Sequence, residues 1–128
     1  MIILVAVNDI FFYAKLRDVL RAGGYTIERA RSQDEVQAKA QALRPAALVL
    51  NMNDPGLDGL QALAQLKAGS QLPSLPVLAF ANHEEVETWQ KAKELGVTKI
   101  VSRNEFSSRT RELVEEVIRS ESSKVNQS

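Results

Sequence analysis

The chain has 128 residues, 45% of them apolar, which is enough for one domain with a single core and too short for two. Sixteen basic and sixteen acidic residues cancel, so no overall charge draws the protein to nucleic acid or to an anionic membrane. The absence of cysteine excludes disulfides, a thiol nucleophile and a thiolate metal site, and a single histidine argues against an imidazole metal cluster. The apolar runs are strand-sized and the N-terminus has no signal-peptide pattern, so we expect a soluble cytoplasmic domain without a membrane span.

Short apolar runs alternate with segments of helical period along the first half of the chain. The run over 2–7 is continuous and rich in β-branched residues, as in a strand buried on both faces. A helix is predicted over 10–22, ended by two glycines, and a short alternating strand follows over 25–30. Ser32 and Glu35 have the spacing of a capping box, which predicts a second helix that stops before a proline.

The second half repeats this alternation. A third strand is predicted over 46–51, followed by a helix that Asp58 can cap, and a fourth strand over 77–81. A helix over 84–95 and a fifth strand over 99–102 come next, before a last amphipathic helix.

The order of these elements predicts the fold class. Repeated units of strand then helix favour a parallel sheet covered on both faces, because right-handed crossovers deliver each helix to one face or the other. We therefore expect an α/β fold, a doubly wound three-layer sandwich with a five-stranded parallel sheet and five helices. The domain is predicted to span 1–119, and the polar segment 120–128 is predicted to be a disordered tail.

The most specific segment is PGLDG, residues 55–59, directly after the third strand. Together with LPVLAFA over 75–81 and KAKELGVTKIV over 91–101, it resembles the receiver domain of two-component response regulators, and the resemblance runs from Met1 to about Arg119. It implies a flavodoxin-like fold with strand order 2-1-3-4-5. It also implies a phosphorylation pocket at the carboxyl ends of the first, third and fourth strands.

The resemblance assigns the five groups of that pocket to Asn8, Asp9, Asn51, Ala81 and Arg103. The two acidic residues that hold Mg²⁺ in the family match Asn8 and Asp9, and the phosphorylated aspartate, four residues before the turn proline, matches Asn51. Ala81 stands where the family has a Ser or Thr that bonds the phosphoryl group. Arg103 stands where the family has a lysine.

These replacements have direct chemical consequences. The amide of Asn51 lacks the anionic oxygen that phosphoryl transfer to a side chain needs. Of the carboxylates that a hard divalent cation prefers, only Asp9 remains, so we expect no metal and no cofactor. Asn8 and Asn51 can instead donate and accept, and we expect them to join Asp9 and Arg103 in a closed hydrogen-bond network.

Several residues near the pocket have a structural and a functional interpretation. Asp9 is expected to cap the first helix rather than hold a residual metal ion, and Arg103 is expected to pair with Asp9 rather than bind an anion. Asp54 could be a displaced acceptor, but a solvated carboxylate in the turn is favoured. His83 is expected to be a solvated loop residue.

Two surfaces could contact a partner. Ile10 and Phe11 fall at the pocket mouth, where local packing over a closed pocket is favoured over a docking patch. Trp89 is either core or interface. Mixed charges along the last helices and the last strand, which include Lys91 and Lys93, could be self-complementary across a two-fold axis.

The favoured hypothesis is a phosphorylation-independent pseudo-receiver, a signalling module that works by protein–protein contact and is not an enzyme. Its partner would be a histidine kinase, a regulator, an output protein or a second copy, with no nucleic acid and no membrane. The main alternative is a flavodoxin-like domain that binds a small ligand or acts as an enzyme in the same pocket, although neither a Gly-rich phosphate loop nor a nucleophile and base supports it. A third hypothesis is a conventional receiver that accepts phosphate elsewhere in the pocket.

Overall fold

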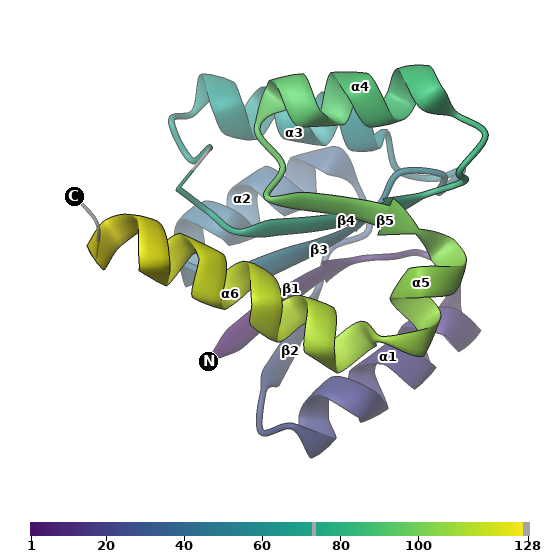
Figure 1. Ribbon diagram of the computed structural model, residues 1–128, viewed down its shortest axis with the longest axis vertical. Helices are drawn as coiled ribbons and strands as arrows, with labels where there is room; N and C mark the ends of the chain where they lie inside the picture. The colour runs from purple at the N-terminus through teal and green to yellow at the C-terminus, as the bar shows by residue number, and fades with distance from the viewer. Residues whose placement is uncertain (73, 127–128) are drawn as a thin grey trace.

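The computed structural model describes residues 1–72 and 74–126, and within them it contains five strands and six helices (Figure 1). The strands are β1 (Ile2–Ala6), β2 (Thr26–Arg29), β3 (Ala47–Asn51), β4 (Val77–Ala81) and β5 (Lys99–Ser102). The helices are α1 (Ile10–Ala22), α2 (Gln33–Leu43), α3 (Gly59–Ala68), α4 (Val86–Leu95), α5 (Arg103–Ser108) and α6 (Thr110–Asn126).

The strands form one parallel sheet in the order β2-β1-β3-β4-β5, which confirms the predicted α/β fold. The register pairs Val5 with Val49 and Leu50 with Ala79, so the apolar runs lie side by side at the centre of the sheet. β3 and β4 are buried along their whole length. This burial explains why both strands are continuously apolar apart from the last residue of β3.

Helices cover both faces of the sheet, which gives three layers (Figure 1). On one face α2, α3 and α4 enclose a core that includes Leu50, Leu63 and Leu66. On the other face α1, α5 and α6 enclose a second core, in which the rings of Phe80 and Phe106 stack with their centroids 4.4 Å apart. Because both faces are covered, only the ends of the strands are available for polar chemistry.

Side-chain caps begin two helices where the sequence predicts them. The hydroxyl of Ser32 accepts the backbone N–H of Glu35 at 3.2 Å, and a carboxylate oxygen of Asp58 accepts the N–H of Gln61 at 3.0 Å. Such caps satisfy N–H groups that have no partner inside the helix. They fix the start of α2 and of α3, and with it the length of the loop after β3.

The carboxyl end of the fold differs from the prediction. A short helix, α5, lies between β5 and α6, so six helices are present where five were expected. Ser102 begins α5 by accepting the N–H of Glu105 at 3.1 Å, and this local cap was not recognised in the sequence.

α6 is also longer than predicted. Its backbone continues to Asn126 through most of the segment predicted as a disordered tail, because the sequence offers neither glycine nor proline to end it. Residues 127 and 128 of that segment lie outside the described residues, and the domain boundary at 119 stays a prediction.

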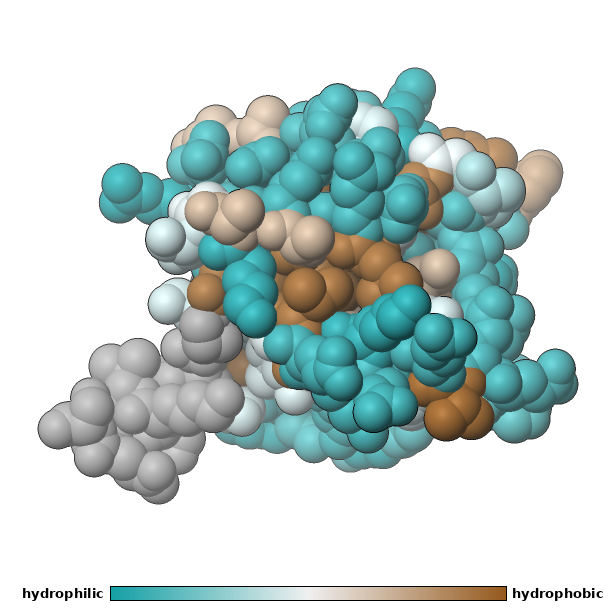
Figure 2. Space-filling view, turned by 90° about the horizontal axis from the view of Figure 1, so that it is seen from above, coloured by the Kyte–Doolittle hydropathy of each residue, from teal (hydrophilic) through white to brown (hydrophobic). Residues whose placement is uncertain are grey.

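α4 begins two residues later than predicted and presents an apolar side chain to solvent. Val86 is 71% exposed, so it does not share the buried stripe of Ala92. Seen from the side of α3 and α4, the surface is mostly hydrophilic, with apolar side chains gathered in a central patch (Figure 2). Within the described ranges, none of the helices combines the length and the apolar composition needed to span a bilayer.

Candidate functional site

The predicted pocket residues do come together at one edge of the sheet. Asn8 and Asp9 follow β1, Asn51 ends β3, Ala81 ends β4, and Arg103 follows β5. Since all five strands are parallel, these positions lie at the carboxyl ends of the strands, where ligands bind in open α/β sheets. The structure separates them, however, into groups that do not bond one another.

Asn51 turns back onto its own loop. The residue is 4% exposed, and its Oδ1 accepts the backbone N–H of Asn53 at 2.9 Å. The next residue, Met52, continues the ladder by donating its N–H to the carbonyl of Phe80 at 2.9 Å. Asn51 therefore works here as a turn residue that organises the start of the loop after β3.

Asn8 is held from several sides by other parts of the chain. Its backbone N–H donates to Oδ2 of Asp54 at 2.6 Å, and its carbonyl accepts from Nη2 of Arg29 at 2.8 Å. Its side-chain Nδ2 donates to the carbonyl of Arg31 at 3.1 Å. The side-chain amide of Asn8 thus points toward the end of β2. It forms no hydrogen bond with Asn51.

Asp54 is buried, which contradicts the predicted solvated turn carboxylate. It is 7% exposed, and while its Oδ2 accepts from Asn8, its Oδ1 accepts the backbone N–H of Gly56 at 3.0 Å. The buried carboxylate is stable there because it accepts hydrogen bonds from two backbone N–H groups that would otherwise lack partners. The bond to Gly56 closes a turn, which the Asp-Pro-Gly sequence predicts locally. Nothing in the neighbouring sequence predicts the bond to Asn8.

Gly56 allows the close approach of two loops. A Cβ at this position would lie 2.6 Å from Nδ2 of Asn8, so the Asn8 amide would have to move away from its bond to Arg31. Asp54 and Gly56 together therefore fasten the β3–α3 loop onto the β1–α1 loop.

Asp9 and Arg103 form a separate pair, as predicted. Oδ1 of Asp9 accepts the backbone N–H groups of Phe11 and Phe12 at 3.0 and 3.1 Å, which confirms its role as the cap of α1. Its Oδ2 lies 3.9 Å from Nη2 of Arg103, whose guanidinium stacks over the Phe12 ring at 4.5 Å from the centroid. The predicted closed network of Asn8, Asn51, Asp9 and Arg103 is wrong. The side chain of Asn8 bonds to Arg31, and that of Asn51 bonds to its own loop at Asn53.

These side chains do not fit the Mg²⁺ ion that receivers hold. A divalent cation needs several free carboxylate oxygens, but both oxygens of Asp54 accept backbone N–H groups, and Asp9 caps a helix. Across the parts of the chain that the structure describes, no group of three or more His, Asp and Glu side chains is arranged to hold a metal ion.

A second set of hydrogen bonds connects the pocket to α4 and includes a residue that the sequence did not single out, Asn53. Its Oδ1 accepts the backbone N–H of Asn82 at 2.7 Å, and its Nδ2 donates to the carboxylate of Glu85. The carbonyl of Asn82 in turn accepts Nε1–H of Trp89 at 3.0 Å. The loop after β3 is therefore bonded to the loop that precedes α4.

The residues proposed for partner contact are placed as follows. Ile10 and Phe11 are 54% and 86% exposed, so the favoured prediction that they pack over the pocket is wrong. The first turn of α1 directs them to solvent. Trp89 is partly buried against the core, and with Val86 and Lys93 it lines an open cavity of about 340 Å³ on one flank of α4. His83 is exposed, as predicted.

Several of the mixed charges along the last helices and β5 are paired within the chain. The pairs include Lys91 with Glu87 at 3.2 Å, Lys99 with Glu116 at 2.6 Å and Arg109 with Glu105 at 2.6 Å. Hydrogen bonding from Arg109 also holds the pKa of the exposed Glu112 carboxyl below its usual range. Charges that are already paired within one molecule contribute little to its contact with a second.

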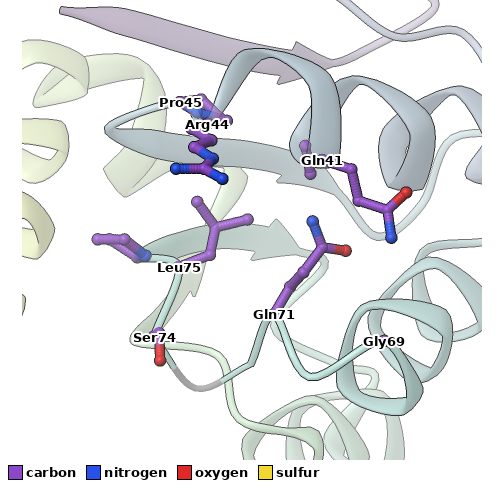
Figure 3. Close-up of a pocket in the computed structure, with 9 residues that line it drawn as sticks. Gln41, Arg44, Pro45, Gly69, Gln71, Ser74 and Leu75 are labelled. Atoms are coloured by element: carbon purple, nitrogen blue, oxygen red, sulfur yellow. The ribbon is translucent and has the colours of Figure 1, made fainter.

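A further cavity, of about 500 Å³, lies at the opposite end of the sheet, beside the prolines that precede β3 and β4 (Figure 3). Figure 3 shows Arg44, Gln71 and Leu75 directed toward its centre. Of the described residues that line it, only Arg44 carries a charge. This cavity therefore holds no set of groups for acid–base or phosphoryl chemistry.

Comparison with known proteins agrees with this geometry. Residues 3–118 match the family model of the response regulator receiver domain. The response regulator MprA of Mycobacterium ulcerans is 40% identical over 78 residues, which cover 60% of this chain and 34% of that protein. A protein-glutamate methylesterase/protein-glutamine glutaminase of Caldanaerobacter subterraneus is 29% identical over 103 residues, which cover 79% of this chain and 28% of that protein.

The same fold is found among solved structures. NtrX from Brucella abortus in complex with ADP superposes with a TM-score of 0.84 at 23% identity, over 98% of this chain and 28% of that chain. The chain thus spans about a third of the length of the curated relatives it matches.

Proposed function

The chain belongs to the response-regulator receiver family, and on that premise we propose that it is a phosphorylation-independent pseudo-receiver that signals through protein–protein contact. The observation that carries this proposal is Asn51. It occupies the position of the phosphorylated aspartate at the end of β3, it is buried, and its side-chain oxygen is bonded to the N–H of Asn53. An amide in this position forms no acyl phosphate.

A second candidate is a receiver that uses Asp54 as a displaced acceptor, and the burial of this carboxylate beside Asn8 favours it. The hydrogen bonds of Asp54 argue against it. Each oxygen accepts a backbone N–H, from Asn8 and from Gly56, so attack on a phosphoryl group would have to break the bonds that hold two loops together.

The partner of the proposed module is a protein, either a component of a phosphorelay or a second copy of the chain. Two exposed apolar surfaces could provide the contact. One is the start of α1 with Ile10 and Phe11, and the other is the α4 flank, defined here as Val86, Trp89 and Lys93. Because nearby charges such as Lys91 and Lys99 are paired within the chain, we assign the main contribution to apolar burial on these surfaces rather than to intermolecular ion pairs.

Titration with Mg²⁺ and beryllofluoride tests the proposal. Heat of binding and Trp89 fluorescence are measured together, since Trp89 is the single tryptophan and is connected to the pocket through Asn82 and Asn53. We expect neither signal to change. Saturable binding, lost in an Asp54→Asn variant, would show that the chain is a receiver with a displaced acceptor.

A further inference from the structure

The loop before α4 is held by one amide side chain. Asn53 accepts the N–H of Asn82 through Oδ1 and donates to the Glu85 carboxylate through Nδ2, so it uses both ends of its amide on a loop about thirty residues away in sequence. Only Asn or Gln carries a donor and an acceptor in this arrangement. The backbone N–H of Asn53 is itself held by Asn51.

Glu85 is committed to this contact at the expense of its own helix. It is the N-cap residue of α4, yet its side chain makes no capping hydrogen bond. Glutamate is not among the residues that cap helices well, and here its carboxylate reaches across to Asn53 instead. The position of the first turn of α4 therefore depends on a bond between loops rather than on a local cap.

The contact is transmitted to Trp89. The carbonyl of Asn82 accepts both the backbone N–H of Glu85 at 3.1 Å and Nε1–H of Trp89 at 3.0 Å. When Asn53 fixes Asn82, it consequently fixes the hydrogen-bond acceptor of the indole. The adjacent residue Ala81 is buried and has no polar side-chain atom, so it cannot provide this anchor.

We propose that Asn53 is the positioning residue of the α4 flank: its amide holds the β4–α4 loop against the β3–α3 loop and keeps Val86, Trp89 and Lys93 in one arrangement without a phosphoryl group. This inference rests on the proposed function, in which the α4 flank is one of two docking surfaces. It adds the residue that sets the conformation of that surface.

The test exchanges the donor and the acceptor between the two loops. Asn53→Asp retains the acceptor for Asn82 but places two carboxylates against each other at Glu85, which breaks the contact. Adding Glu85→Gln restores a donor, so the amide and carboxylate are exchanged and the bond can form again. Exposure of the indole is followed by acrylamide quenching of Trp89 fluorescence, and global stability is followed separately by thermal unfolding.

We expect Asn53→Asp and Asn53→Ala to raise the quenching constant about twofold through local opening of the loop, with little change in the midpoint of thermal unfolding. The double variant Asn53→Asp with Glu85→Gln is expected to return the quenching constant to that of the parent. Glu84→Gln, next to Glu85 in the β4–α4 loop, and Asn104→Ala, in the first turn of α5, are matched controls, and neither should change it.

Two results would overturn the inference: unchanged quenching in Asn53→Asp, or quenching in the double variant that remains as high as in the single one. The experiment is independent of acyl phosphate. Binding of beryllofluoride would contradict the proposed function but not the role of Asn53. A double variant that does not restore the parent quenching would contradict the role of Asn53 alone.

Discussion

The carboxylate of Asp54 accepts the backbone N–H of Asn8 at 2.6 Å, across 46 positions of sequence. This bond joins the loop after β3 to the loop after β1, the two segments that hold acidic residues in a receiver. Here the buried carboxylate serves the backbone rather than a metal ion. The pocket is therefore stabilised by hydrogen bonds within the chain.

Replacing Asp54 tests this structural role. Asp54→Asn leaves one oxygen for two backbone donors, so an N–H of Asn8 or Gly56 loses its partner, and the free energy of unfolding should fall by about 1–3 kcal/mol. Asp58→Asn is the matched control. It caps α3 from an exposed position, where Asn caps as well as Asp, so its cost should be within a few tenths of a kcal/mol. Equal costs in urea unfolding would contradict a special role for Asp54.

Restoring carboxylates should change the pocket in a measurable way. Asn8→Asp with Asn51→Asp adds two negative charges near Asp9 and Asp54, which should lower the unfolding temperature without metal because like charges repel. Mg²⁺ should then bind and recover the lost stability. If Mg²⁺ raises the unfolding temperature of the double variant no more than that of the parent, the assignment of these positions to the pocket fails.

Self-association should depend on apolar side chains more than on charge. Val86→Ser should weaken any dimer seen by sedimentation, because Val86 is 71% exposed on the α4 flank. Lys91→Glu should have a smaller effect, since Lys91 is paired with Glu87 of its own helix at 3.2 Å. A dimer that is insensitive to Val86→Ser and abolished by reversal of Lys91 and Lys93 would place the contact on charges instead. A strict monomer at high concentration would exclude the homodimer.

Tyr25 should make stability fall at alkaline pH. Burial, followed by the nearby Glu115 carboxylate, raises the pKa of its phenol above 10.0 in the folded state. The folded chain then keeps the phenol proton to a higher pH than the unfolded chain does. The contribution of Tyr25 to the free energy of unfolding is therefore complete below pH 10 and is lost as the pH rises through the folded pKa. In a Tyr13→Phe background, tyrosinate absorbance should report this raised value, and Tyr25→Phe should flatten the alkaline fall in stability. A Tyr25 titration at the ordinary value would contradict it.

The features that the sequence predicted correctly are local in the chain. Ser32 and Asp58 cap helices through residues three positions away, and the continuous apolar runs identify the central strands. The short helix α5 was missed although Ser102 caps it in the same way, because six residues are too few for a clear helical period.

The interactions that the sequence did not predict join distant segments. The sequence around Asp54 predicts a solvated turn residue, and only its bond to Asn8 explains its burial. Asn53 has no local signal at all, since its partners Asn82 and Glu85 lie 29 and 32 positions away. Ile10 and Phe11 could not be assigned from periodicity, because their exposure depends on how the first turn of α1 meets the strand ends.

Incubation with acetyl phosphate and Mg²⁺, followed by intact-protein mass spectrometry, tests the central claim most directly. The parent chain should gain no phosphoryl group, because Asn51 offers no carboxylate and the oxygens of Asp54 are held by Asn8 and Gly56. An acid-stable, hydroxylamine-sensitive adduct on the parent chain that disappears in Asp54→Asn would contradict the account and identify Asp54 as the acceptor.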